Sequence, residues 1–204
     1  MTGGETFAIC DNSVDTMSFP NLKTVEPDLS MSSFCSFDNV LYIPNVEILT
    51  NLSISSPAFT STGMREGTLI GFNKLEEIDN IDLDIDFSNE YFKIDGFSNL
   101  KKVNGLFKIS AIGSSFDISE HSFLNLSDIN EGKIYKNFDA DESVRLVNIL
   151  PTLKRCNNLE IYNFEPSDAC YLKEYIQSGE ISIQMLNTFT NENFDSESIL
   201  ELCN

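Results

Sequence analysis

The chain has 204 residues, with 13 Lys+Arg against 32 Asp+Glu and a formal net charge of −19 at pH 7. This excess of acid argues against binding to a nucleic-acid phosphate backbone, which needs clustered cations, and against docking on an anionic membrane surface. Hydrophobic residues make up 41% of the chain and aromatic residues 11%, which is too many for an acidic disordered segment, so the sequence predicts a folded acidic domain.

Residues 1–18 precede the first repeat of the chain and are predicted to form an N-terminal cap. The stretch ETFAICDN alternates apolar and polar residues, as a capping strand would. The N-terminus lacks the basic and apolar regions of a signal peptide, and no apolar run is long enough to cross a bilayer. A leader peptide is therefore not visible, and membrane insertion is not expected.

Residues 19–164 repeat one apolar pattern six times, and this pattern organises the chain. Each copy has apolar residues three apart and then a short run that is apolar at every second position; the copies start at Phe19, Ile43, Phe72, Phe97, Phe123 and Leu150. The starts are 24, 29, 25, 26 and 27 residues apart. One unit cannot bury its apolar edge alone, but stacked units bury a continuous column. The pattern predicts a mainly β (α/β) solenoid of about six repeats with parallel strands.

The motif F-x-x-L-x-x-φ-x-x-L-x-φ, in which φ is aliphatic, resembles leucine-rich repeats over residues 19–164. The copy FSNLKKVNGLFKI looks like receptor L-domain repeats, and SAIGSSFDISEHSF is similar to BspA-like surface repeats. This resemblance implies a right-handed coil, ligand binding through the outward strand face, and an extracellular or cell-surface location. The chain departs from these families in lacking a regular asparagine ladder and in its variable inserts at 55–71 and 110–122.

Residues 165–204 are predicted to cap the other end of the column with helices. The Ser-Asp pair at 167–168 is the expected start of a helix that ends at Gly179, ISIQML is expected to be a strand, and DSESILELC a final helix. Just before the last repeat, Asp139 is the expected N-cap of a short helix at about 140–149.

The five cysteines include no C-x-x-C motif, and the single His121 cannot complete a Cys/His metal site with them. Two interpretations remain open for these thiols. They form disulfides, with Cys10–Cys35 and Cys156–Cys170 as the nearest pairs in the sequence, or they are small buried side chains.

Two N-glycosylation sequons occur, Asn51-Leu52-Ser53 and Asn125-Leu126-Ser127. They fit a secreted eukaryotic protein, but an asparagine-rich chain also produces such tripeptides by chance, so they leave the compartment open.

Signatures of catalysis are absent from the sequence. G-x-S-x-G, H-E-x-x-H and the P-loop do not occur. His121 lies in the polar stretch SEHSF, where a surface or capping role is expected rather than that of a general base. The chain is predicted not to be an enzyme and to use neither a cofactor nor a metal.

The densest acidic cluster is the stretch IDNIDLDIDF, with aspartates at alternate positions 82, 84 and 86. It fails as an EF-hand loop because the sixth and twelfth positions are Phe87 and Lys93. A strand with its isoleucines and leucine inward and its aspartates outward explains the pattern better. The aspartates then form a solvated face, a patch for a basic partner, or a weak cation site.

Stacking the repeats places outward residues of successive strands in files. The candidate ligand-binding residues are Asp82, Phe107 and Glu160 in one file and Asp84 and Tyr162 in the next. The register of the fourth copy stays open, because either Leu106 or Phe107 in GLFKI can face inward. An outward aromatic ring beside carboxylates would suit a cationic protein surface.

These observations lead to two hypotheses. The first is a non-catalytic recognition module that binds a protein with a basic surface, or a glycan, through the strand face. The alternative is a structural surface or adhesion segment whose acidic face responds to cations.

Overall fold

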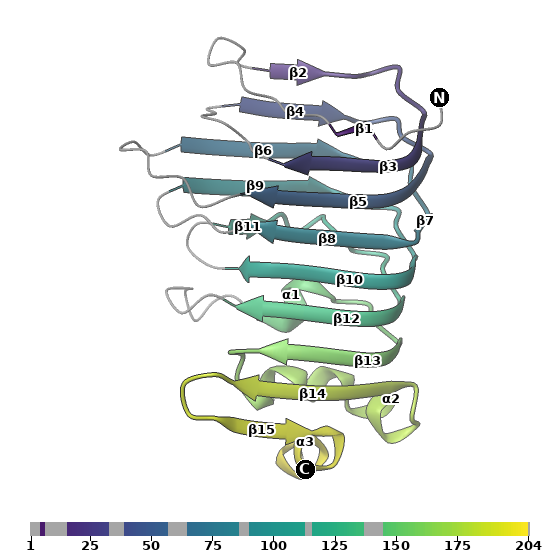
Figure 1. Cartoon of the computed structure of the whole chain (residues 1–204). Helices are drawn as coiled ribbons and strands as arrows, with labels where there is room; N and C mark the ends of the chain where they lie inside the picture. Colours follow the sequence, from purple (N-terminus) through teal and green to yellow (C-terminus); the bar gives the residue numbers. More distant parts are fainter. Residues whose placement is uncertain are drawn as a thin grey trace.

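The computed structural model describes residues 5–6, 16–32, 39–56, 65–85, 90–112, 116–136 and 145–203. They form a β-solenoid of about five turns, in which parallel strands stack along one column (Figure 1). The predicted solenoid with parallel strands is confirmed. The starts of the six repeat copies are separated by five stretches of sequence, and each stretch corresponds to one turn of the coil.

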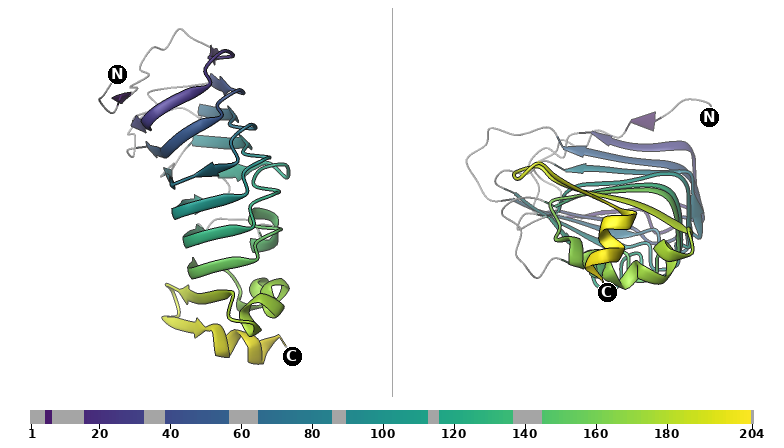
Figure 2. Two further views of the ribbon diagram at one scale, coloured as in Figure 1. Left: turned by 90° about the vertical axis from the view of Figure 1, so that its right-hand side faces the viewer. Right: turned by 90° about the horizontal axis from the view of Figure 1, so that it is seen from below.

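Two sheets run along the column. The first contains β1 (Glu5–Thr6), β3 (Thr24–Ser32), β5 (Ile48–Ser56), β7 (Glu77–Ile78), β8 (Asn80–Ile85), β10 (Lys102–Ile112), β12 (Asp128–Lys136), β13 (Arg155–Tyr162), β14 (Ile181–Asn187) and β15 (Glu192–Asp195). The second contains β2 (Thr16–Ser18), β4 (Asn39–Ile43), β6 (Arg65–Gly71), β9 (Glu90–Gly96) and β11 (Phe116–Ile118). Viewed along the column, strands of successive coils superpose and turn the same corner (Figure 2, right).

Long strands of the first sheet bend near their start, where the register with the next strand shifts. We call the residues before the bend the short arm of the strand and those after it the long arm. Asn80 Nδ2 donates to Asn51 Oδ1 at 2.6 Å, and Asn51 Nδ2 donates to Asp28 Oδ1. The Leu106 N–H then donates to Asn80 Oδ1 at 2.7 Å. A short polar ladder across the bend is therefore present, although the sequence showed no regular one.

The core contains a column of stacked phenylalanines at the turns between the two sheets. Phe72, Phe97 and Phe123 are fully buried, and their ring centroids lie 4.9 and 5.0 Å apart. All three have positive φ, at 58°, 61° and 55°, a conformation that bulky residues rarely adopt. In each turn the leucine three residues later donates its N–H to the phenylalanine carbonyl at 3.1–3.2 Å. The F-x-x-L motif of the repeat thus encodes a tight turn with an inward ring.

Helices take the place of the second sheet towards the C-terminal end (Figure 1). They are α1 (Leu146–Ile149), the 3₁₀ helix η1 (Pro166–Leu172), α2 (Lys173–Gln177) and α3 (Ser196–Leu202). Strand β15 pairs antiparallel with β14 and so ends the parallel stack. The Asp195 carboxylate caps α3 by accepting from the Ser198 N–H at 2.9 Å.

Several expectations for this end are confirmed and others are wrong. The strand at ISIQML and the final helix are present. The cap helix begins at Pro166, directly after Glu165, because a proline at the first helical position loses no hydrogen bond. Helix α1 begins only after Arg145, and Asp139 lies outside the described residues.

The cysteine pairing differs from the nearest-neighbour expectation. Cys170 forms a disulfide with Cys203, which ties η1 to the end of α3. The expected Cys156–Cys170 pair is therefore wrong, because Cys156 is a free thiol buried in the column. Cys10 and Cys35 lie outside the described residues.

Candidate ligand-binding face

The outer face of the long arms carries two files of residues in register. The first file consists of Ser30, Ser53, Asp82, Lys108, Lys133, Glu160 and Gln184. Two residues further along each strand, the adjacent positions include Asp84, Ser110, Tyr135, Tyr162 and Leu186. The structure thus brings Asp82, Asp84, Glu160 and Tyr162 to one face, as predicted from the repeat.

Phe107 does not belong to this face. It pairs in register with Ile81, its side chain is fully buried, and its ring meets that of Phe123 edge-on at 5.2 Å. The bend explains the difference: Gly105 lies beside the Asn80 amide, and the strand then turns Phe107 inward and Lys108 outward. The expectation that Phe107 contacts a ligand is therefore wrong.

Lys108 lies between the two aspartates of the preceding coil. Its Nζ is 3.2 Å from Asp82 Oδ1 and 2.9 Å from Asp84 Oδ2. Burial lowers the pKa of the Lys108 ammonium, but the contacts with Asp84 and Asp82 raise it more, so the net direction is upward. The Lys108 ammonium therefore offsets the repulsion between the two neighbouring carboxylates, and the three groups together retain one negative charge.

Glu160 is the centre of a second polar group. Lys133 Nζ lies 3.0 Å from Glu160 Oε2, the Tyr162 hydroxyl donates to the same oxygen at 2.9 Å, and Asn158 Nδ2 donates to Oε1 at 3.2 Å. Burial raises the pKa of Glu160, but these three donors lower it more, so the carboxylate is stabilised in its charged form. The side chain is only 19% exposed.

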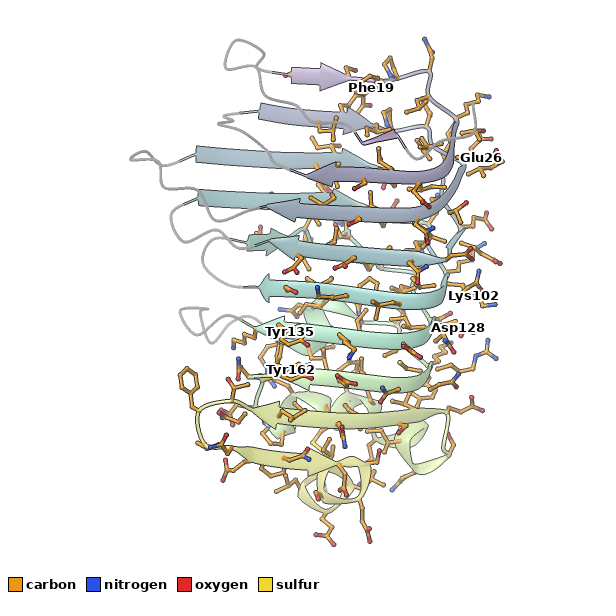
Figure 3. All side chains as sticks on the ribbon, in the orientation of Figure 1. Phe19, Glu26, Lys102, Asp128, Tyr135 and Tyr162 are labelled. Atoms are coloured by element: carbon orange, nitrogen blue, oxygen red, sulfur yellow. A yellow bond between two sulfur atoms is a disulfide. The ribbon has the colours of Figure 1, made fainter. Side chains whose placement is uncertain are left out.

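Two tyrosines stand beside this carboxylate. The rings of Tyr135 and Tyr162 stack with centroids 4.0 Å apart and planes 8° from parallel (Figure 3). We call Lys133, Tyr135, Glu160 and Tyr162 the tyrosine cluster. Its ring stack and hydrogen bonds hold the side chains in fixed positions, so a ligand would meet a preorganised surface.

Sequence reasoning missed Lys108, Lys133 and Tyr135. The register of GKIY in the fifth copy could have revealed Tyr135, because Ile134 faces inward and its neighbours therefore face outward. The same register reveals Lys133, whereas Lys108 becomes visible only when the fourth copy is aligned through the bend.

A second polar feature lies on the short arms. A hollow of about 250 Å³ is lined mainly by charged and amide side chains, including Lys102, Asp128, Asn130, Arg155 and Asn157. Arg155 Nη2 lies 2.5 Å from Asp128 Oδ2, and Asn157 Nδ2 donates to Asn130 Oδ1 at 2.8 Å. Figure 3 places Lys102 and Asp128 at the opposite end of the strands from Tyr135 and Tyr162. The hollow is therefore separate from the tyrosine cluster.

Two absences hold within the ranges that the structure describes. Within them, no three His, Cys, Asp or Glu side chains gather in a way that could hold a metal ion. None of the helices that the structure describes has the length and apolar character required to span a membrane.

The buried Cys156 thiol gives a direct test of the column. Burial raises its pKa to about 12, so at pH 8 only about one thiol in ten thousand is ionised. We expect native protein to leave Cys156 unmodified by iodoacetamide, whereas urea-unfolded protein is alkylated there, as peptide mass spectrometry would show. Rapid alkylation of Cys156 in the native protein would contradict its burial.

Comparisons with family models, with curated proteins and with solved structures found no match to this chain.

Proposed function

We propose that this chain is a non-catalytic recognition module that binds a protein ligand through the outer face of the long arms, centred on the tyrosine cluster. The observation that carries the proposal is the stacked Tyr135–Tyr162 pair beside the charged Lys133 and Glu160 side chains. Tyrosine supplies a large, rigid contact area with a polar end, and it is enriched among the residues that dominate protein interfaces.

The charge of the chain favours a partner with a basic surface. The net charge of −19 would attract such a partner over a distance and speed its encounter. Close to the site the charges are mixed, because Lys108 and Lys133 pair with the acidic residues. The contact itself would therefore depend on the tyrosines, and the acidic surface would mainly affect the association rate.

Two features support a resemblance to leucine-rich repeats of the L-domain type, which is more specific than a solenoid in general. Each coil that reaches both sheets contributes a strand to each of them, and the turns bury a repeated phenylalanine. Two sheets fit a straight L-domain-like column better than a horseshoe whose outer side is helical. In such solenoids the extended strand face is a common ligand-binding surface.

The test is to find and then weaken the contact. A photo-crosslinking amino acid at position 162 should capture the partner from cells that produce the protein, and the same group at position 42 should not. Tyr42 is the control because it is an exposed tyrosine, at 37%, on β4 of the second sheet.

With the captured protein purified, Tyr162→Ala should raise Kd at least tenfold, which corresponds to about 1.4 kcal/mol or more, while Tyr42→Ala leaves Kd unchanged. Isothermal titration calorimetry measures both values. Equal losses for the two variants, or a loss for Tyr42→Ala alone, would refute the proposed face.

A further inference from the structure

The two sequons, Asn51-Leu52-Ser53 and Asn125-Leu126-Ser127, are identical tripeptides in very different surroundings. We propose that Asn125 is an N-glycosylation site and that Asn51 cannot carry a glycan in the folded protein. This inference is independent of the proposed ligand-binding face.

Asn125 lies on the exposed turn between β11 and β12. Its Nδ2 donates to the Ser98 carbonyl oxygen of the preceding coil at 2.6 Å, and the residue is exposed. A primary amide has two N–H groups, and glycosylation replaces only one of them. The remaining N–H can keep the bond to Ser98 while the sugar extends into solvent. The folded turn therefore accepts the modification.

Asn51 lies inside the polar ladder at the bend. Its Nδ2 donates to Asp28 of the coil before, and its Oδ1 accepts from Asn80 of the coil after at 2.6 Å. Neighbouring strands are only about 4.8 Å apart, so a sugar on Nδ2 has no room between them. Attachment there would separate the coils and leave part-buried polar groups without partners.

The chemistry of N-glycosylation fits the compartment that the disulfide indicates. The Cys170–Cys203 bond persists in oxidising compartments such as the secretory lumen. There the co-reactant is a lipid diphosphate-linked oligosaccharide. The Asn125 amide nitrogen forms a bond to sugar C1, the bond from C1 to the diphosphate oxygen breaks, and the lipid diphosphate leaves with the electron pair. The amide nitrogen loses one proton, and no oxidation or reduction is involved.

The site also leaves the proposed ligand-binding face accessible. Asn125 lies three residues before β12 begins, and Tyr135 lies near the other end of that strand. Figure 3 shows the start of β12, marked by Asp128, at the edge of the sheet away from Tyr135. A glycan on the turn would extend from that edge.

The test uses the full chain, secreted behind a cleavable leader from cultured eukaryotic cells. Intact mass before and after peptide N-glycosidase treatment should show one glycan, and treatment in ¹⁸O-water should label position 125. Ser127→Ala should remove the glycan, and Ser53→Ala should leave it in place. Both variants destroy a sequon while keeping the asparagine, so neither is expected to disturb the fold, which circular dichroism checks.

Three results would overturn the inference. They are an unmodified Asn125 in the secreted folded protein, a glycan that persists in Ser127→Ala, and a glycan on Asn51 in protein with the native circular dichroism spectrum. If the Ser53→Ala variant lost the mass shift, the glycan would be on Asn51, which contradicts the inference in the same way as the third result.

Discussion

Replacing Phe97 by alanine is expected to lower the free energy of unfolding by about 3–5 kcal/mol. Phe97 is the middle ring of the phenylalanine column and stacks on both Phe72 and Phe123. Its removal leaves a cavity that the neighbouring coils cannot close, because the parallel strands fix their spacing. Such a loss is a large part of the stability of an ordinary domain. Urea unfolding followed by circular dichroism measures it.

Phe19 provides the matched control for this substitution. It is the first residue of the first repeat, as Phe97 is of the fourth, but the residue is 39% exposed. Phe19→Ala should cost clearly less than Phe97→Ala, about 1 kcal/mol, because most of the difference between the two sites is burial. Equal losses from the two variants would show that the rings do not form a buried column.

Replacing Gly96 by alanine is expected to have the second largest effect. A Cβ at this position would lie 2.1 Å from the carbonyl oxygen of Gly71, its register partner on the adjacent strand. The obstacle is backbone, so no side-chain rotation can relieve it, and the two coils would have to separate. We expect a loss of about 3 kcal/mol, at the upper end of overpacking effects, measurable as a lower urea midpoint.

Gly179→Ala separates steric from conformational effects. Gly179 has a φ of 79°, but nothing lies within 4 Å of a Cβ placed there. Its substitution should cost only about 1 kcal/mol, from the strained backbone. If Gly179→Ala destabilised the protein as much as Gly96→Ala, the close approach of Gly96 to Gly71 would not be the cause.

The repeat could be predicted from the sequence because its period has a direct structural counterpart. At the corners of four coils, a backbone N–H donates to a carbonyl oxygen one turn earlier. These bonds run from Glu47 to Lys23, from Lys101 to Glu76, from Ser127 to Lys101 and from Lys154 to Ser127. These corners follow the spacing of the apolar motif. Burial of one stripe of each unit requires this regularity, so the pattern is visible without any knowledge of contacts.

The register beyond the bend could not be predicted in the same way. Leu106 and Phe107 are both apolar, so alternation alone does not decide which one faces inward. The choice depends on Gly105, whose missing side chain leaves room for the Asn80 amide and shifts the strand. Lys108 therefore lies beside Asp82 and Asp84, which precede it by about one repeat. This contact depends on the shift of the strand at Gly105.

The tyrosine cluster and the disulfide were missed for related reasons. Tyr135 lies in the short run GKIY at the end of the fifth copy, where alternation marks it as outward only once Ile134 is assigned to the core. Cys170 and Cys203 are 33 residues apart, and they meet only because β15 reverses direction and returns α3 to η1. Proximity in sequence favoured Cys156, whose side chain faces the core. Helical packing at a cap has no periodic pattern from which such contacts could be read.

The most direct test of the stacked column is a pair of distances along the first file. Spin labels on unnatural amino acids at Ser30 and Glu160, five strands apart in register, should give a backbone separation of about 24 Å by double electron–electron resonance. Labels at Ser30 and Gln184, one strand further, should give about 29 Å. An increase of one strand spacing for 24 residues of sequence is the result that parallel stacking predicts. A second distance that is no longer than the first, or longer by several strand spacings, would contradict the solenoid.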